Sequence, residues 1–404
     1  MKIDTFICSE CMLAVGGSQT YIFRMMEYMD KQNVRKIIFI WDGEIIADEW
    51  KVLIEKYNIE IYFFSQFNPL EIPKSFDGNP VEFKKNENVI SISMRTESFI
   101  NSCFLERKFK HANIRSFYYI LHSNLLRLKI DNKHVRKIYK RLALKGILAD
   151  RLFFMDQYTK GNAENYFGKK LNSPVIRLGM KIPELDETFI DNRINSKVFT
   201  ILSVSRMAFP FKGYNVGLLE DYIRLKKEYS DIRLVLVGSG EGVIELKNRL
   251  NSEPDYIRND VIFCGTIEYE GLREYFAQAN VFVGMGTTVL DAANTGLITV
   301  TALSYQKDNY SGGFFHDDVN SIGYIYNKGN EKGDFYDYIK EVYNYDEAKY
   351  RECSGKTYAL YKEEYDIGMV MEKILNLKTK RKRPGLYEIE LYKFIVDMSE
   401  IMHI

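Results

Sequence analysis

Two cations stand six residues apart in a segment that could hold a diphosphate. Arg206 and Lys212 follow the apolar run 199–204, which is typical of a β-strand, and Gly213 comes directly after the lysine. Two cations on one loop at the carboxyl end of a strand are suited to neutralise phosphate oxygens. Solvated surface charge is the usual state of lysine and arginine, so the pair alone leaves both interpretations open.

A glycine-rich segment, 284–288, follows another apolar run. Gly286 allows close backbone approach to a ligand, and Thr287 or Thr288 could cap the helix expected next. The exposed N–H groups of that helix would then face a phosphate. We expect Asp291 in the first helical turn, where it could reach a ribose; the alternative is that it only complements the helix dipole.

Further candidates lie at other predicted strand ends. Gly238 follows the run 233–237 in a Gly-Ser-Gly turn, which any tight turn would also explain. Gly16 and Gly17 open a helix after the first strand, so this turn could approach a bound phosphate, although a plain turn is the alternative. His122 follows the run 116–121 at a predicted strand end and is either a ligand contact or a structural residue.

Short apolar runs alternate with amphipathic stretches along the whole chain, which predicts an α/β fold with parallel sheets. In the first half we predict helices at 20–29 and 48–56 and strands at 2–7, 36–41, 59–64, 89–93, 116–121, 148–155 and 175–178. In the second half we predict helices at 216–229, 243–251, 271–278 and 289–294, and strands at 199–204, 233–237, 261–264, 281–283 and 298–301.

The polar stretch 184–196 lacks apolar periodicity and is interpreted as a linker. We therefore predict a first domain at 1–190, a second at 197–366, and a C-terminal segment at 367–404. The segment is expected to contain a helix near 386–398, which either returns to the first domain or docks a partner.

Bulk composition excludes several classes. With 404 residues, 46% hydrophobic residues and a net charge of +1, the chain is globular and has no overall attraction for nucleic acid. It has no run of about 18 apolar residues and no charged signal-like start, so we expect a cytoplasmic protein. The Cys8–Cys11 pair lacks the second pair that zinc needs, and no Asp-x-Asp occurs, so we expect no metal.

Positive charge is concentrated in two segments. Residues 107–145 contain twelve Lys or Arg and one acid, and 378–383 reads KTKRKR. Such runs are usually solvated faces. An anionic membrane surface or a lipid-diphosphate acceptor is the competing interpretation, which would place the protein at the inner face of the membrane.

Taken together, the second half resembles the retaining glycosyltransferase family numbered four, which has the GT-B fold of two Rossmann-like domains facing across a cleft. The matching residues are SVSRMAFPFKGYNVGLLEDY, IRLVLVGSGE, VIFCGTI and LREYFAQANVFVGMGTTVLDAANTGLITVT. The resemblance implies that Arg206 and Lys212 bind the donor diphosphate, Asp291 binds the ribose, and His122 touches the transferred sugar. It implies a retaining reaction without metal or other cofactor, from a nucleotide sugar (UDP favoured) to a glycan or lipid-linked acceptor.

The sequence departs from the family at the donor loop. Val283 stands where an acid is usual, eight residues before Asp291, and the acid at Asp291 is Asp instead of Glu. The shortened GMGT loop is similar to that of transferases that build bacterial capsules and O-antigens. The missing acid also admits a non-catalytic GT-B subunit that binds a partner transferase or glycan. A GT-B epimerase is disfavoured because it would need paired acids and a suitable histidine.

Overall fold

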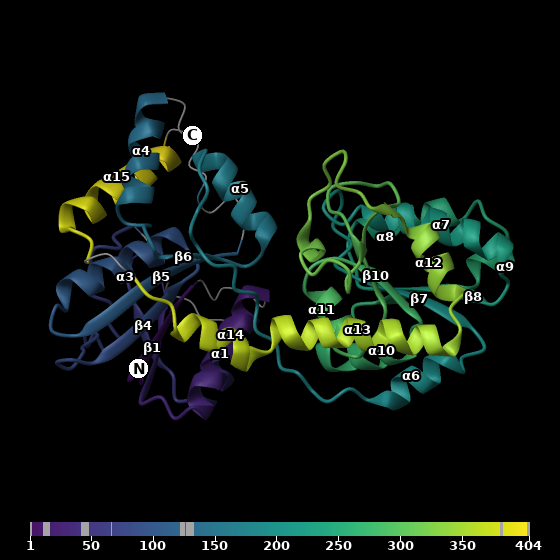
Figure 1. The fold of residues 1–404 in the computed structure, drawn as a ribbon, viewed down its shortest axis with the longest axis horizontal. Coiled ribbons are helices and arrows are strands. Elements are labelled where there is room, and N and C mark those ends of the chain that lie inside the picture. The colour runs from purple at the N-terminus through teal and green to yellow at the C-terminus, as the bar shows by residue number, and fades with distance from the viewer. Residues whose placement is uncertain are drawn as a thin grey trace. The chain divides into compact units, whose positions relative to one another are not determined.

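The computed structural model describes residues 2–10, 17–41, 48–65, 67–121, 126, 133–379 and 383–401. The chain forms two compact units, one made of Met1–Lys181 with Tyr365–Ile404 and the other of Ile182–Glu364. Each unit is a sheet flanked by helices (Figure 1). The predicted α/β class with two Rossmann-like domains is confirmed.

The first unit contains a six-stranded sheet in the order β3-β2-β1-β4-β5-β6, with every pairing parallel. Its strands are β1 (Thr5–Ser9), β2 (Lys36–Trp41), β3 (Glu60–Phe63), β4 (Asn88–Ser93), β5 (Asn113–Ile120) and β6 (Leu152–Phe154). The strand order reverses between β1 and β4, as in doubly wound folds. The predicted strand at 175–178 is instead an isolated bridge between Phe154 and Val175.

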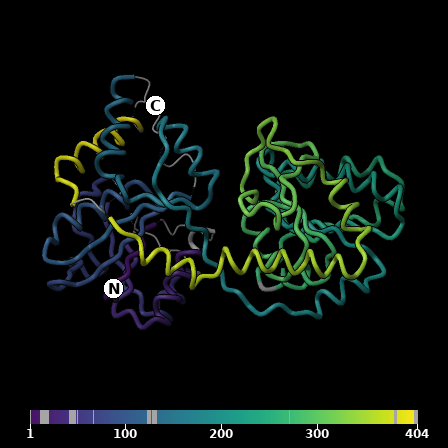
Figure 2. The backbone as a smooth tube through the Cα atoms, viewed as in Figure 1, coloured from purple at the N-terminus to yellow at the C-terminus, as the bar shows by residue number. Residues whose placement is uncertain are grey.

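Helices cover both faces of this sheet. They are α1 (Gly17–Lys31), α2 (Asp48–Lys56), α3 (Thr96–Lys108), α4 (Lys133–Lys145), α5 (Gln157–Phe167), α14 (Ile367–Leu375) and α15 (Leu386–Ile401). The last two helices come from the C-terminal segment: α14 packs on α1, and α15 packs on α3 and α4. The C-terminal helix α15 therefore belongs to the first unit (Figure 2).

The second unit contains a seven-stranded sheet in the order β13-β12-β11-β10-β7-β8-β9. Its strands are β7 (Phe199–Val204), β8 (Ile232–Val237), β9 (Val261–Gly265), β10 (Val281–Gly284), β11 (Thr299–Ala302), β12 (Tyr310–Phe314) and β13 (Gly333–Asp334). β12 pairs antiparallel with both β11 and β13 at one edge, and the pairings among β11, β10, β7, β8 and β9 are parallel.

The helices of the second unit are α6 (Glu187–Ile194), α7 (Tyr214–Glu228), α8 (Gly242–Leu250), α9 (Asp255–Arg258), η1 (Tyr269–Gly271), α10 (Leu272–Gln278), α11 (Thr287–Ala293), η2 (Ser321–Gly323), α12 (Phe335–Tyr343) and α13 (Glu347–Tyr365). The helices predicted in this half correspond to α7, α8, α10 and α11, and their observed ends differ from the predicted ones by at most two residues. Strand β7 has the predicted bounds.

The linker predicted at 184–196 is wrong, because α6 occupies most of it and belongs to the second unit. Ile190 and Arg193 are buried there. The Arg193 guanidinium donates to the carbonyls of Phe276 (2.8 Å) and Thr295 (3.0 Å). These carbonyls lie at the carboxyl ends of α10 and just beyond α11, where the helix dipoles place partial negative charge. Arg193 therefore joins two helix ends to α6, a role that a polar sequence pattern does not disclose.

Replacing Arg193 with methionine is expected to destabilise the second unit by about 1–3 kcal/mol, because buried carbonyls lose their donors. Urea unfolding would measure the loss. Arg258→Met is the matched control, since Arg258 is exposed and its ion pair with Asp255 is a surface pair. Equal midpoints for the two variants would contradict the anchoring role of Arg193.

Candidate functional site

The crossover of the second sheet lies between β7 and β10. Successive strands run outward from β7 through β8 to β9, and the chain then returns to β10 on the other side of β7. In open parallel sheets this switch point leaves a crevice at the carboxyl ends of the strands, where ligands bind. The loops that follow β7 and β10 carry the candidates Arg206, Lys212 and 284–288, so the topology brings both candidate segments to one place.

Lys212 joins these two loops directly. Its ammonium group donates to the carbonyl oxygen of Met285 at 3.3 Å, and the Thr288 hydroxyl donates to the same carbonyl at 3.3 Å. The Arg206 side chain is exposed on the same loop as Lys212. The two cations are close enough for their charges to interact. An anion between the loops would therefore meet positive charge from Lys212 and Arg206 together.

Burial lowers the pKa of the Lys212 ammonium to about 8 from 10.5, and repulsion by Arg206 adds to the effect. A lowered lysine pKa means that the unliganded fold gains stability as pH rises from about 8 toward 10.5, and loses it as pH falls. Burial favours the neutral form of Lys212 in the unliganded fold, whereas a bound diphosphate favours the protonated form.

We expect the affinity of the chain for a nucleoside diphosphate to fall as pH rises above about 8, by up to tenfold for each pH unit, because binding must then protonate Lys212. Titration calorimetry at pH 7, 8 and 9 would measure the change. The same series with Lys212→Arg should be nearly flat, since arginine stays charged. A wild-type series without pH dependence would contradict this role for Lys212.

Asn215 braces the loop that carries the cations. Its side chain donates to the Lys212 carbonyl (2.9 Å) and to the Ser205 hydroxyl (3.2 Å), and it accepts from the Ser203 hydroxyl (3.2 Å). The residue is fully buried in the first turn of α7. The sequence analysis missed Asn215; an asparagine three residues after Lys212, in the first turn of the following helix, was the available signal.

Gly238 is required for the packing of two adjacent loops. A Cβ on Gly238 would lie 2.0 Å from the Ser205 carbonyl oxygen, and its φ of +122° also favours glycine. Gly240 likewise lies against the Met207 carbonyl. These glycines hold the end of β8 against the cation loop. Donor binding by Gly238 itself stays a prediction.

The predicted threonine cap of α11 is wrong. Gly286 is the N-cap, with φ of +76°, and neither Thr287 nor Thr288 caps with its side chain, because both lie inside the helix. The Gly286 N–H donates to the carbonyl of Ile322 at 2.6 Å, so this donor is already used. Thr287 is exposed, and Thr288 is held by Met285. Their contact with a donor stays a prediction.

Asp291 lies in the second turn of α11, not in the first as expected. It follows Thr288 by three residues, so the two side chains share one face of the helix. The phenol of Tyr269, in η1, donates to the Asp291 carboxylate at 2.8 Å. Sequence reasoning did not find Tyr269, because nothing in the 3-10 turn after β9 reveals a contact with α11.

Two exposed aromatic side chains lie beside Lys212. The Phe211 and Tyr305 rings are 5.1 Å apart between centroids, and the Lys212 ammonium lies 5.1 Å from the Phe211 ring. Tyr305 has a φ of +61°, which is unusual for a tyrosine, and its N–H donates to the Phe211 carbonyl. This aromatic pair was also not predicted.

Some candidates cannot be placed. Gly16 and His122 lie outside the described residues, as do 380–382 of the basic C-terminal run. Gly17 is the first residue of α1. Within the basic segment 107–145, Lys133–Lys145 form α4, with most of the basic side chains exposed together with Val135 and Ile138.

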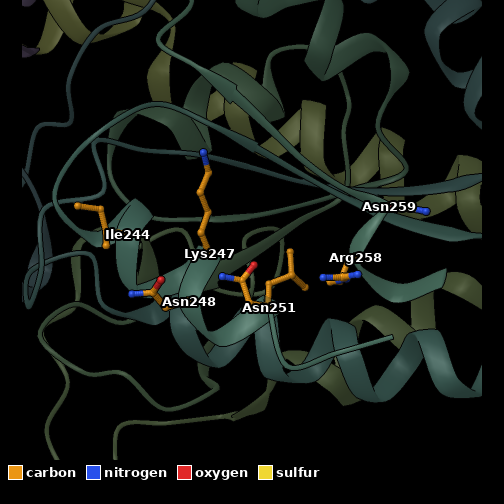
Figure 3. A pocket seen from close by; sticks show the side chains of 7 residues that line it. Ile244, Lys247, Asn248, Asn251, Arg258 and Asn259 are labelled. Carbon is orange, nitrogen blue, oxygen red and sulfur yellow. The ribbon is translucent and has the colours of Figure 1, made fainter. Parts of the chain in front are cut away.

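An open hollow of about 560 Å³ lies on a different part of the second unit. Its lining comes from α8 and the residue after it and from the end of α9, and includes Lys247, Asn251 and Arg258 (Figure 3). These segments precede β9 and lie at its amino end. The hollow is therefore separate from the carboxyl ends of the strands, where the candidate residues gather.

The described residues contain neither a candidate metal site nor a helix suited to span a membrane. Within the part of the chain that the structure describes, no three His, Cys, Asp or Glu side chains gather as metal ligands. In those same residues, no helix has the length and apolar character needed to cross a membrane.

Residues 198–343 match the family model described as glycosyl transferases group 1. This segment is therefore similar to a glycosyl transferase group 1 domain. It covers β7 to α12 and contains the cation loop, the 284–288 segment and Asp291. No sequence among curated proteins matches the chain.

Solved structures share the fold of the whole chain. A glycosyltransferase from Rickettsia africae is 15% identical, with a TM-score of 0.60, and the match covers 98% of this chain and 99% of that one. A TarM mutant from S. aureus is 14% identical (TM-score 0.57; 93% and 99% covered), and sucrose-phosphate synthase from Thermosynechococcus elongatus is 13% identical (0.56; 93% and 98%). These structures confirm the predicted GT-B fold. The match over residues 198–343 supports the predicted enzyme class, a nucleotide-sugar glycosyltransferase.

Proposed function

We propose that this glycosyltransferase moves a sugar from a nucleotide diphosphate, with UDP as the favoured nucleotide, to a saccharide or lipid-linked acceptor in bacterial surface-glycan synthesis, with retention of anomeric configuration. The observation that carries the proposal is the meeting of Lys212 and Thr288 at the Met285 carbonyl, with Arg206 on the same loop. This arrangement offers positive charge where a diphosphate leaving group would need it.

In the proposed reaction an acceptor hydroxyl oxygen forms a bond to the anomeric carbon from the face of the leaving group. The bond between that carbon and the diphosphate oxygen breaks, and the hydroxyl proton passes to the departing diphosphate. Arg206 and Lys212 stabilise the negative charge that develops there, so the step needs no metal. Retention follows from attack on the leaving-group face, as the family resemblance implies.

Proteins with the same fold give context for donor and acceptor. The TarM structure was obtained in complex with fondaparinux, α-GlcNAc-glycerol and UDP. Another structure of this fold, 12% identical with a TM-score of 0.51, is the lipopolysaccharide outer core galactosyltransferase WaaB. These proteins are compatible with the proposed UDP-sugar donor and surface-glycan acceptor.

The donor is tested by incubating the purified chain with UDP-, GDP- and dTDP-sugars and measuring nucleotide release with and without a mixed glycan acceptor. We expect one UDP-sugar to give release that depends on the acceptor, and an α-linked sugar from an α-linked donor in the NMR spectrum of the product. Chelation of metal with EDTA should leave the rate unchanged. If none of the nucleotide sugars binds, the proposal is wrong.

A non-catalytic subunit remains the second candidate, because Val283 occupies the position of the usual first acid. Such a subunit would bind a glycan or a partner transferase without releasing nucleotide. Binding of a nucleotide sugar together with absence of release under every acceptor condition would favour it over the transferase.

We also propose that α4 meets an anionic membrane surface. Arg136, Lys137 and Arg141 are exposed on this helix, and the apolar side chains of Val135 and Ile138 are exposed with them. Basic and apolar side chains together favour the interface of anionic lipids. Co-sedimentation with phosphatidylglycerol vesicles should occur at low salt and be lost in Ile138→Asp; equal binding to neutral vesicles would contradict the proposal.

A further inference from the structure

Tyr269 is an exposed tyrosine whose hydroxyl group is nevertheless fixed. The residue keeps 57% of its surface accessible, while its phenol donates to the Asp291 carboxylate at 2.8 Å. It begins η1, four residues after the end of β9. An aromatic ring held at its polar tip but open to water on its apolar body has the form of a preformed contact for a flat ligand.

The position of Tyr269 relative to the candidate diphosphate site indicates which part of a nucleotide would lie beside it. Lys212 and Thr288 meet at the Met285 carbonyl, and Asp291 lies one helical turn beyond Thr288 on the same face of α11. Phosphates at Lys212 would therefore place the next part of a nucleotide, its ribose, toward Asp291. The base follows the ribose, on the side where Tyr269 contacts Asp291.

The surroundings of η1 have the polarity that a nucleoside needs. The hydroxyl groups of Ser239 and Thr266, on the turns after β8 and β9, lie 2.8 Å apart and are exposed. The Gly238 N–H donates to the Gly265 carbonyl at 2.7 Å, which joins the same two turns. A Cβ on Gly265 would meet nothing within 4 Å, so the surface beside this turn is open.

We propose that Tyr269 is a nucleoside-binding residue with two functions: its hydroxyl group orients the Asp291 carboxylate toward the ribose hydroxyls, and its ring stacks on the base. The proposal rests on the proposed function, because it assumes a nucleotide donor at Lys212. It adds a residue that the sequence did not indicate, and it makes the carboxylate of Asp291 a preorganised acceptor.

The two functions are separated by two variants of the full chain. Titration calorimetry would compare UDP with 2′-deoxy-UDP, and GDP with 2′-deoxy-GDP, for the wild type, Tyr269→Phe and Tyr269→Ala. Tyr256→Phe is the matched control, since Tyr256 is similarly exposed (55%) and lies on α9, which precedes β9, whereas Tyr269 follows that strand. Thermal unfolding midpoints of all variants would be measured alongside.

We expect the wild type to prefer the ribonucleotide, and Tyr269→Phe to reduce that preference about threefold to tenfold through loss of the hydrogen bond to Asp291. Tyr269→Ala should in addition weaken the binding of both the ribonucleotide and the 2′-deoxyribonucleotide about tenfold, because the ring no longer stacks on the base. A purely structural tyrosine would change the unfolding midpoint and leave the ribose preference as it is.

The outcomes separate a failure of the proposed function from a failure of the proposed role of Tyr269. If the wild type binds no nucleoside diphosphate, the proposed function fails and this inference with it. If it binds but Tyr269→Phe keeps the full ribose preference, or the wild type has none, the orienting role of Tyr269 is wrong while the proposed function stands. If Tyr269→Ala binds as tightly as Tyr269→Phe, the stacking role is wrong.

Discussion

Lys212→Met is expected to lower kcat/KM for sugar transfer by about a hundredfold to a thousandfold, the usual effect of removing one charged group from a transition state that develops negative charge. The lysine is suited to this role because its half-buried ammonium bridges the loops after β7 and β10. Partial exclusion from water strengthens its interaction with a departing diphosphate. Initial rates with the donor identified in the release assay would measure the effect.

The controls for Lys212 separate charge from shape. Lys212→Arg keeps the positive charge and should retain more activity than Lys212→Met, although its planar head group fits the Met285 carbonyl differently. Lys328→Met removes an exposed lysine from the same unit and should leave the rate unchanged. If Lys212→Met and Lys328→Met have equal rates, Lys212 does not stabilise the leaving group.

Glu106→Ala is expected to destabilise the first unit by about 3–5 kcal/mol, because it leaves a buried arginine without its counter-ion. The guanidinium of Arg151 donates to both Glu106 oxygens, at 2.7 and 2.9 Å, and to the Ser116 carbonyl at 3.1 Å. Arg151 is 1% exposed and Glu106 3% exposed, so water cannot replace the lost partner. Chemical denaturation would measure the loss.

The charge explanation for this pair is tested by removing both partners. Glu106→Leu combined with Arg151→Met should recover most of the stability lost in Glu106→Ala, since no unpaired buried charge remains. Asp48→Ala, at an exposed ion pair with Lys51, serves as the surface control and should shift the midpoint little. Equal losses in the single and double variants would show that packing, and not charge, is responsible.

Local patterns in the sequence were enough to place the strands that carry the site. The apolar run 199–204 became β7 with its predicted bounds, and Arg206 and Lys212 follow it on one loop. The joining of this loop to Met285 depends on the strand order, which puts β10 beside β7 although about 80 residues separate them. Order along the chain does not specify such neighbours, and here the family resemblance was needed to expect them.

The errors in the sequence analysis have physical causes. The segment 184–196 was interpreted as a linker because it is polar and lacks apolar periodicity, and a buried polar residue such as Arg193, which donates to two helix ends, is indistinguishable by type from a solvated one. Thr287 and Thr288 are good capping residues, but the φ of +76° at Gly286 places the cap one residue earlier. Tyr269 contacts Asp291 through tertiary structure alone.

The connection between the two units has a consequence for how such chains can be recombined. The Met180 N–H donates to the Tyr365 carbonyl at 2.6 Å, and the Ile367 N–H donates to the Met180 carbonyl at 2.9 Å, so the chain leaves the first unit and re-enters it at neighbouring points. The second unit, Ile182–Glu364, is therefore one uninterrupted segment whose attachment points are adjacent. A segment of this kind can be exchanged as a cassette between homologous scaffolds with two cuts, and such hybrids would test directly whether the second unit sets the donor preference.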